Sequence, residues 1–156
     1  MPTTQIFATF LVDGLLFGLP AAEVLELTNA RELTRVPLAP PTVVGLMNLR
    51  GQIIAAIDLR RRLDLRPRPV GQPPMNVVLR TAGETVSLLV DQVGEVLELG
   101  DETFEAAPET VRGVAREPLR GVHKLPGRLL LLLDPQRLLA GIIVETRKPL
   151  SAPLTS

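Results

Sequence analysis

The chain alternates short apolar segments with turns that contain glycine or proline, a pattern typical of a protein built mainly from β-strands. Residues 6–12 place apolar side chains at every second position, the period of a strand with one buried face. Asp13-Gly14 follows, a dipeptide that favours the positive φ angles of a tight hairpin turn, and residues 15–19 supply the return strand. Similar pairs of apolar segments flank Arg50-Gly51, Ala82-Gly83 and Pro126-Gly127. The sequence therefore predicts a series of β-hairpins.

Short helices and one linker are predicted between these hairpins. Pro20 suits a first helical turn, and the apolar residues after it predict a helix over 20–26. Asp58 and Asp134 are good N-cap residues, and each precedes leucines that pack one side of a short helix. Residues 66–74 contain four prolines, which predicts a semi-rigid linker between two subdomains.

The two halves of the chain resemble each other. Glu23-Val24-Leu25-Glu26-Leu27 recurs letter for letter as Glu95-Val96-Leu97-Glu98-Leu99. Farther along, Gly51 precedes Asp58 by seven residues, as Gly127 precedes Asp134. Two matches in the same order indicate a tandem pair of β-barrel-like units that pack on one another and leave a groove between them.

Composition narrows the class of protein. The 156 residues carry 17 basic and 17 acidic side chains, and no basic stripe suits a nucleic acid; Arg60-Arg61-Arg62 is interpreted as a solvated helix face. No cysteine is present, which excludes disulfides and fits a reducing compartment. The longest apolar stretches are far shorter than the roughly 20 residues of a membrane span, so no membrane insertion is expected and a cytoplasmic location is predicted.

Side chains for catalysis are scarce. The single histidine, His123, lies in a strand pattern, and no cluster of metal-ligating residues accompanies it. A hydrolytic triad of Ser87, His123 and either Asp91 or Asp134 is formally possible, but Ser87 lies within a strand and has no nucleophile-elbow glycines around it. The sequence therefore favours a binding protein without catalytic activity, metal or cofactor.

The order of several short motifs resembles that of the CheW family of chemotaxis coupling proteins. The resemblance covers residues 5–139, nearly the whole chain. The segments that carry it are Val24-Leu25-Glu26-Leu27, Arg35-Val36-Pro37, Pro40, Val44-Gly45-Leu46-Met47-Asn48-Leu49-Arg50-Gly51, Ile57-Asp58-Leu59-Arg60, residues 88–97 and Leu131-Leu132-Leu133-Asp134. Asn48-Leu49-Arg50-Gly51 is specific because Asp58-Leu59 follows it at the family's spacing.

The resemblance implies an all-β fold, mainly strands with short helices, made of two intertwined five-stranded SH3-like barrels. Residues 1–156 are expected to form one CheW-like domain, with subdomains at about 14–70 and 75–134 and with the segments 5–12 and 135–145 packing across them. The implied role is a scaffold, recruited to membrane-associated receptor arrays, that couples the cytoplasmic tip of methyl-accepting chemoreceptors to the regulatory domain of a CheA-type histidine kinase. A CheW-like domain redeployed as a structural or localisation adaptor in another signalling system is the alternative.

The resemblance also implies two contact regions. The receptor-binding candidates are Val24, Glu26, Asn48 and Arg50, and the kinase-binding candidates are Val43 and Gly45. For Arg50 there is a physical argument as well, because its planar guanidinium can bind a carboxylate bidentately, on Glu26 or on a receptor. Gly51 is expected to allow close backbone approach. A simple turn arginine at 50, and simple core packing for Val24, are the alternatives.

Overall fold

The computed structural model describes residues 3–29, 33–34, 41–106, 113–140 and 142. The residues 35–40 of the family pattern, and the tail beyond 142, lie outside this description. The elements are β1 (Thr4–Val12), β2 (Leu15–Pro20), η1 (Ala21–Glu23), β3 (Val24–Thr28), β4 (Val43–Leu49), β5 (Gln52–Asp58), α1 (Leu59–Arg62), β6 (Met75–Thr81), β7 (Glu84–Val90), β8 (Gln92–Gly100), η2 (Asp101–Thr103), β9 (Phe104–Ala106), β10 (Leu119–Leu125) and β11 (Arg128–Leu133). Residues 135–140 form a further short helix.

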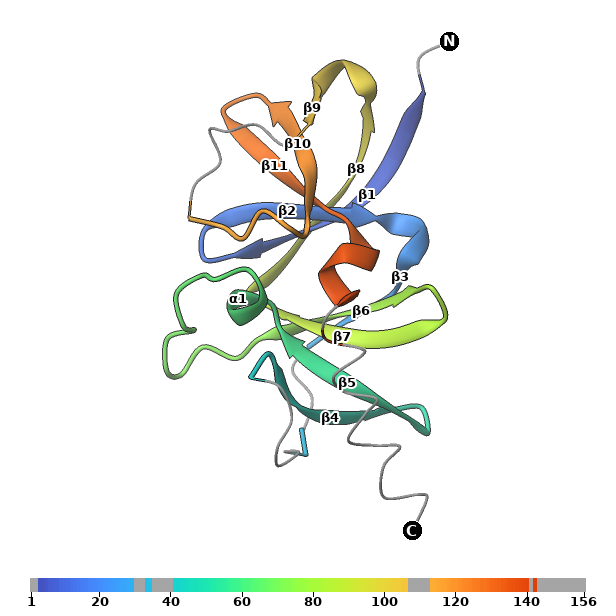
Figure 1. Cartoon of the computed structure of the whole chain (residues 1–156), viewed down its shortest axis with the longest axis vertical. Helices are drawn as coiled ribbons and strands as arrows, with labels where there is room; N and C mark the ends of the chain where they lie inside the picture. The colour runs from blue at the N-terminus through green and yellow to red at the C-terminus, as the bar shows by residue number, and fades with distance from the viewer. Residues whose placement is uncertain (1–2, 30–32, 35–40, 107–112, 141, 143–156) are drawn as a thin grey trace.

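These strands form two sheets, which confirms the mainly-β prediction. The six-stranded sheet has the order β8-β1-β2-β11-β10-β9, and the five-stranded sheet has the order β3-β6-β7-β5-β4. In Figure 1 the first sheet occupies the upper half of the molecule and the second the lower half. The sixth strand is β9, a three-residue strand that pairs with β10.

The sheets show how the two sequence repeats are arranged. The strands of the first repeat are β1 to β5, and those of the second are β6, β7, β8, β10 and β11. The hairpin β1–β2 pairs with β8 and, in parallel, with β11, whereas the hairpin β6–β7 pairs with β3 and, in parallel, with β5. Each repeat thus inserts its first hairpin into the sheet of the other, and the halves are intertwined.

This exchange divides the chain differently from the predicted subdomains 14–70 and 75–134. The five-stranded sheet takes residues 24–90, and the six-stranded sheet takes both flanking parts of the chain. The proline-rich segment 66–74 therefore joins α1 to β6 within one subdomain. The prediction was wrong because a stiff loop marks a break between elements, and only strand pairing decides which elements share a sheet.

Local structure agrees with the sequence except at one predicted helix. Asp58 caps α1 by accepting a hydrogen bond from the amide of Arg60 at 3.0 Å, and Leu59 and Leu63 are buried as expected. The predicted helix over 20–26 is wrong, since only η1 is helical there and β3 begins at Val24. The residues of β3 alternate between half-buried and exposed positions, as a strand requires, and pairing with β6 stabilises it.

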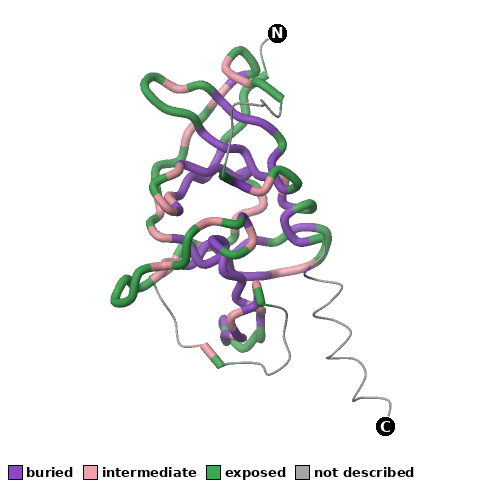
Figure 2. Tube along the Cα trace, turned by 60° about the vertical axis from the view of Figure 1, so that its left-hand side comes forward, coloured by how far each residue is buried: buried purple, intermediate pink, exposed green. Residues whose placement is uncertain are grey.

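One apolar core fills the space between the sheets. Phe10 and Phe17 from the six-stranded sheet, and Leu79 and Leu88 from the five-stranded sheet, belong to the same buried cluster, which also includes Leu138 of the C-terminal helix. A smaller cluster of Met47, Leu49, Ile54 and Val78 lies on the other face of the five-stranded sheet. In Figure 2 the buried residues run through the middle of the molecule, and exposed residues gather at the turns.

Candidate functional site

The tip of the β4–β5 hairpin presents the arginine that the sequence singled out. Arg50 and Gly51 have φ angles of 54° and 87°, and Leu49 pairs with Gln52 across the turn. The amide of Gly51 donates to Asn48 Oδ1 at 2.8 Å. A Cβ on Gly51 would meet nothing within 4 Å, so glycine is required for the positive φ and not for the close approach that was expected.

Arg50 reaches from this turn to the edge strand β3. Its Nη2 lies 3.5 Å from Glu26 Oε1, which confirms Glu26 as its carboxylate neighbour. The Arg50 side chain is 81% exposed and that of Glu26 is 19% exposed. A pair with such an exposed arginine contributes only about 0–1 kcal/mol to stability, and the exposed Arg50 side chain remains accessible to a partner's carboxylate.

Exposed aliphatic side chains occur on the same strands as this ion pair. Ile53, which is 60% exposed, pairs in register with Asn48 on the same hairpin. Leu25 and Leu27 of β3 flank Glu26 and are also exposed. A charged pair on strands that also carry exposed aliphatic side chains suits contact with another protein, in which apolar burial supplies affinity and charge supplies orientation.

Val24 is not part of this surface. It pairs with Leu79 and packs against the shared core, whereas Glu26 pairs with Val78 after a register shift. The irregularity between Val24 and Glu26 places these two receptor candidates on different faces of β3. The structure therefore brings together Glu26, Asn48 and Arg50, and it gives Val24 a packing role.

The two kinase candidates lie on β4, the edge strand of the five-stranded sheet. Val43 is only 7% exposed and belongs to the shared core. A Cβ on Gly45 would lie 2.7 Å from the carbonyl oxygen of Thr34. That oxygen accepts a hydrogen bond from the amide of Leu46, and the amide of Thr34 donates one to the carbonyl of Leu46. Both positions thus have a structural reason for their residue type.

The residues of the formal hydrolytic triad do not meet. Ser87 lies on β7 of the five-stranded sheet, where its hydroxyl donates to Asn76 Oδ1 at 2.8 Å. His123 lies on β10 of the six-stranded sheet, between the rings of Phe7 and Phe104, with its Nδ1 2.7 Å from the Thr103 hydroxyl. Burial holds the pKa of His123 below its ordinary value, although the carboxylates of Asp101 and Glu102 partly oppose this shift.

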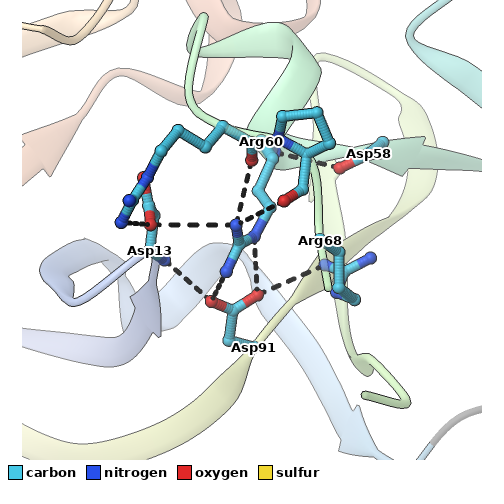
Figure 3. Close-up of polar contacts among 7 residues, drawn as sticks. Asp13, Asp58, Arg60, Arg68 and Asp91 are labelled. Atoms are coloured by element: carbon cyan, nitrogen blue, oxygen red, sulfur yellow. Dashed lines mark hydrogen bonds and ion pairs between the residues drawn. The ribbon is translucent and has the colours of Figure 1, made fainter. Parts of the chain in front are cut away.

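Sequence reasoning missed a cluster of charged side chains between the sheets (Figure 3). Its centre is Arg60, whose side chain is 5% exposed and which donates to Asp91 Oδ1 from Nε at 3.1 Å and to Asp91 Oδ2 from Nη2 at 2.5 Å. Arg66 pairs with Asp13 at 2.8 Å, and Arg68 lies 3.4 Å from Asp91. The prediction of a solvated face for Arg60-Arg61-Arg62 was therefore wrong for Arg60.

The other two arginines of that run also have specific partners. Arg61 donates to the carbonyl of Pro41 at 2.8 Å. Arg62 donates from Nε to the carbonyl of Leu138 at 2.7 Å, which places a positive charge near the C-terminal end of the last helix. The repeat comparison offered one signal for Arg60: the corresponding residue after Asp134 is Gln136, so the arginine belongs to one half only, as Arg50 does.

The carboxylates of the cluster are held in the ionised form. Burial alone would raise the pKa of Asp91, but hydrogen bonds from Arg60 and from the Asp13 amide, together with the charges of Arg60 and Arg68, outweigh it and lower the pKa. The hydrogen bond from Arg66 likewise lowers the pKa of Asp13. The hydrogen bond to Asp91 raises the pKa of Arg60 further. Asp13, Asp91 and Arg60 are thus charged at neutral pH.

In the parts of the chain that the structure describes, no group of three or more histidine, cysteine or carboxylate side chains is placed to hold a metal ion. Over the same residues, no helix has the length and apolar character needed to cross a membrane.

Comparison with known proteins gives a consistent picture. The family model of the CheW-like domain matches residues 7–142. The chemotaxis protein CheW of Klebsiella aerogenes is 32% identical over 136 residues, which are 87% of this chain and 82% of that protein. CheW of Bacillus subtilis is 27% identical over 137 residues, covering 88% of each chain.

A solved structure agrees with the fold. The crystal structure of the scaffolding protein TtCheW from Thermoanaerobacter tengcongensis superposes with a TM-score of 0.76 at 26% identity, over 86% of this chain and 90% of that one. This similarity and the two sheets confirm the predicted fold class of two SH3-like subdomains. The family model, the sequence relatives and the fold together show that this chain belongs to the CheW family of chemotaxis proteins.

Proposed function

We propose that this CheW-family chemotaxis adaptor couples the cytoplasmic tip of methyl-accepting chemoreceptors to the regulatory domain of a CheA-type histidine kinase, as a scaffold without catalytic activity. It works in the cytoplasm and is recruited to membrane-associated receptor arrays by these partners. Family membership supports the role, because the relatives are chemotaxis proteins and the similar solved structure is that of a scaffolding protein.

The observation that carries the receptor contact is the exposed Arg50–Glu26 pair. It joins the β4–β5 hairpin to the edge strand β3, and the same hairpin carries Asn48 and the exposed Ile53. A receptor carboxylate approaching Arg50 gains a charge-assisted hydrogen bond at little cost, since the existing pair is weak. Val24 then contributes by packing against the core, and not by direct contact.

The kinase contact is proposed at β4, around Val43 and Gly45. Its support is the position of β4 at the edge of the five-stranded sheet, where a partner strand can pair with backbone groups. Because the Val43 side chain is buried and Gly45 has none, the contact uses the backbone of this strand. Thr34 occupies the part of the edge at Leu46.

Charge reversal at Arg50 tests the receptor contact. In titration calorimetry with the cytoplasmic fragment of a chemoreceptor from the same organism, Arg50→Glu is expected to weaken binding by about tenfold or more, because it replaces an attractive interfacial charge with a repulsive one. Affinity for the kinase regulatory domain is expected to stay within about twofold of wild type, because β4 edge pairing does not involve this side chain.

Two controls separate a partner contact from a fold effect. Arg80→Glu makes the same charge change on an exposed residue of β6 and is expected to leave receptor affinity unchanged. The swap Arg50→Glu with Glu26→Arg restores an internal pair, so it rescues binding only if the arginine serves the fold. Receptor binding by Arg50→Glu at wild-type affinity, or full rescue by the swap, would contradict the proposal.

A further inference from the structure

The chain passes between the two sheets at two points among the described elements, and the second is unusually short. The first passage runs through η1, between β2 and β3. At the second, β7 ends at Val90 and β8 begins at Gln92, so Asp91 alone joins the two sheets. A single connecting residue has few backbone angles to absorb a change in the relative orientation of the sheets, and its side chain lies where both sheets meet.

Asp91 is held from both sheets at once (Figure 3). From the β1–β2 turn of the six-stranded sheet, the amide of Asp13 donates to Asp91 Oδ2 at 2.7 Å, and the amide of Asp91 donates to the carbonyl of Leu11 at 3.0 Å. From α1 and the proline-rich loop, which connect β5 to β6 of the five-stranded sheet, Arg60 binds the carboxylate bidentately and Arg68 adds a contact at 3.4 Å.

Arg60 is itself held in place by the residues on either side of it in the chain. Its amide donates to Asp58 Oδ1 at the start of α1, and its Nη1 donates to the carbonyls of Arg66 at 2.9 Å and Pro67 at 3.1 Å. The proline-rich loop therefore fixes the orientation of the guanidinium plane independently of Asp91. A planar guanidinium held in this way accepts the Asp91 carboxylate in one orientation only, whereas a lysine ammonium would accept it in many.

The energetics favour a geometric role for this pair. Buried ion pairs are weak sources of net stability, because desolvation of the two charges offsets their attraction, but their hydrogen bonds tolerate only one arrangement. Shielding from solvent also makes such a pair much less sensitive to salt than an exposed pair. The hydrophobic attraction that forms the shared apolar core is, in contrast, non-directional and does not by itself specify one angle between the sheets.

We propose that the Arg60–Asp91 pair is a lock that fixes the angle between the two subdomains. The lock itself does not depend on the identity of any partner. Its consequence for signalling rests on the proposed function: with the angle fixed, a receptor bound beside Arg50 and a kinase bound to the same chain keep a constant relative orientation. Arg60 and Asp91 are positioning residues in this sense and contact neither partner.

The test measures the distance between the subdomains in the intact chain. Because the protein contains no cysteine, Arg80→Cys on β6 and Lys124→Cys on β10 introduce one spin label in each sheet at exposed positions. Pulsed dipolar spectroscopy is expected to give one narrow distance distribution for the otherwise wild-type chain. Arg60→Gln is expected to broaden it at least twofold, and Arg61→Gln, on the exposed neighbour, is expected to leave it unchanged.

Arg60→Lys keeps the charge and loses the planar fork, so it serves if Arg60→Gln does not fold, and it is expected to give intermediate broadening. A folded Arg60 variant with the wild-type width overturns the proposal, and so does failure of both variants to fold, which would make the pair a folding requirement.

A binding assay tests the consequence for signalling. A folded Arg60 variant is expected to keep its affinity for the receptor alone and for the kinase alone within twofold of wild type, and to lose the three-component complex. If Arg50→Glu loses receptor binding while the Arg60 variants do not, that result concerns the proposed function and does not count against the lock.

Discussion

Burial gives two arginines of this chain different purposes. The side chain of Arg50 is 81% exposed and forms a 3.5 Å pair on the surface, whereas that of Arg60 is 5% exposed and is bound by several acceptors. Arg50 lies next to Gly51 in a hairpin turn, and Arg60 lies in a short helix that Asp58 caps. The sequence alone does not show which of the two arginines is buried. The accessible arginine is suited to a partner, and the enclosed one is suited to fixing structure.

The single histidine predicts how stability depends on pH. His123 is buried against Phe7 and Phe104, and burial lowers its pKa, so the folded chain takes up a proton less readily than the unfolded chain. The free energy of unfolding is therefore expected to fall as the pH drops below the unfolded-state pKa of about 6.5, by at most about 1.4 kcal/mol per pH unit.

Urea unfolding at pH 7.5 and at pH 5.5 measures this dependence. His123→Gln removes the titrating group while keeping a polar side chain near Thr103, and its stability is expected to change much less between the two pH values. An equal loss in both proteins would show that another group is responsible. The lowered pKa values of Asp13, Asp91 and Asp134 act in a separate window below about pH 4, where protonation removes their contribution.

At the scale of elements, the short helices depend on their caps. The helix at 135–140 begins after Asp134, whose Oδ1 accepts from the amides of Gln136 at 3.0 Å and Arg137 at 3.1 Å. This helix is too short to be stable alone, and it carries the buried Leu138 and Leu139 into the shared core. Loss of the cap therefore affects the core as well as the helix.

Asp134→Ala is expected to lower the free energy of unfolding by about 1 kcal/mol, which corresponds to roughly 2–4 °C in the melting temperature of a chain of this size. Asp134→Asn is the matched control, because its amide oxygen accepts the same backbone hydrogen bonds and preserves most of the stability. Thermal unfolding followed by circular dichroism measures both variants. Equal destabilisation by the two changes would assign the effect to the carboxylate charge and its contact with Arg120.

For the whole molecule, the exchanged hairpins make the two sequence halves dependent on each other. Fragments 1–70 and 71–156 correspond to the repeats, but β1–β2 needs β8 and β11 as neighbours, and β6–β7 needs β3 and β5. Each fragment alone is expected to lack a cooperative unfolding transition. An equimolar mixture is expected to recover the β-sheet signal and a transition in circular dichroism. A cooperative transition in either isolated fragment would contradict this expectation.

The sequence by itself determined the local structure and the family. Period-two alternation, glycines at positive φ and aspartate caps depend on nearest neighbours along the chain, so the hairpins around Asp13-Gly14 and Arg50-Gly51 and the short helices after Asp58 and Asp134 were predicted correctly. The repeat of Glu-Val-Leu-Glu-Leu likewise predicted two related units. Arg50 with Glu26 followed from the motif and the family resemblance.

Only the tertiary structure decided which strands share a sheet and which charges are buried. Hairpin β6–β7 has no local feature that assigns it to β3 and β5, because strand pairing is a competition among distant segments for one apolar core. For the same reason Val24 faces the core while Glu26, beyond a register shift, does not, and Arg60 is buried against Asp91, 31 positions away. Burial is a property of the whole fold. It left Arg50 exposed on the surface, and it enclosed Arg60 where the two sheets meet.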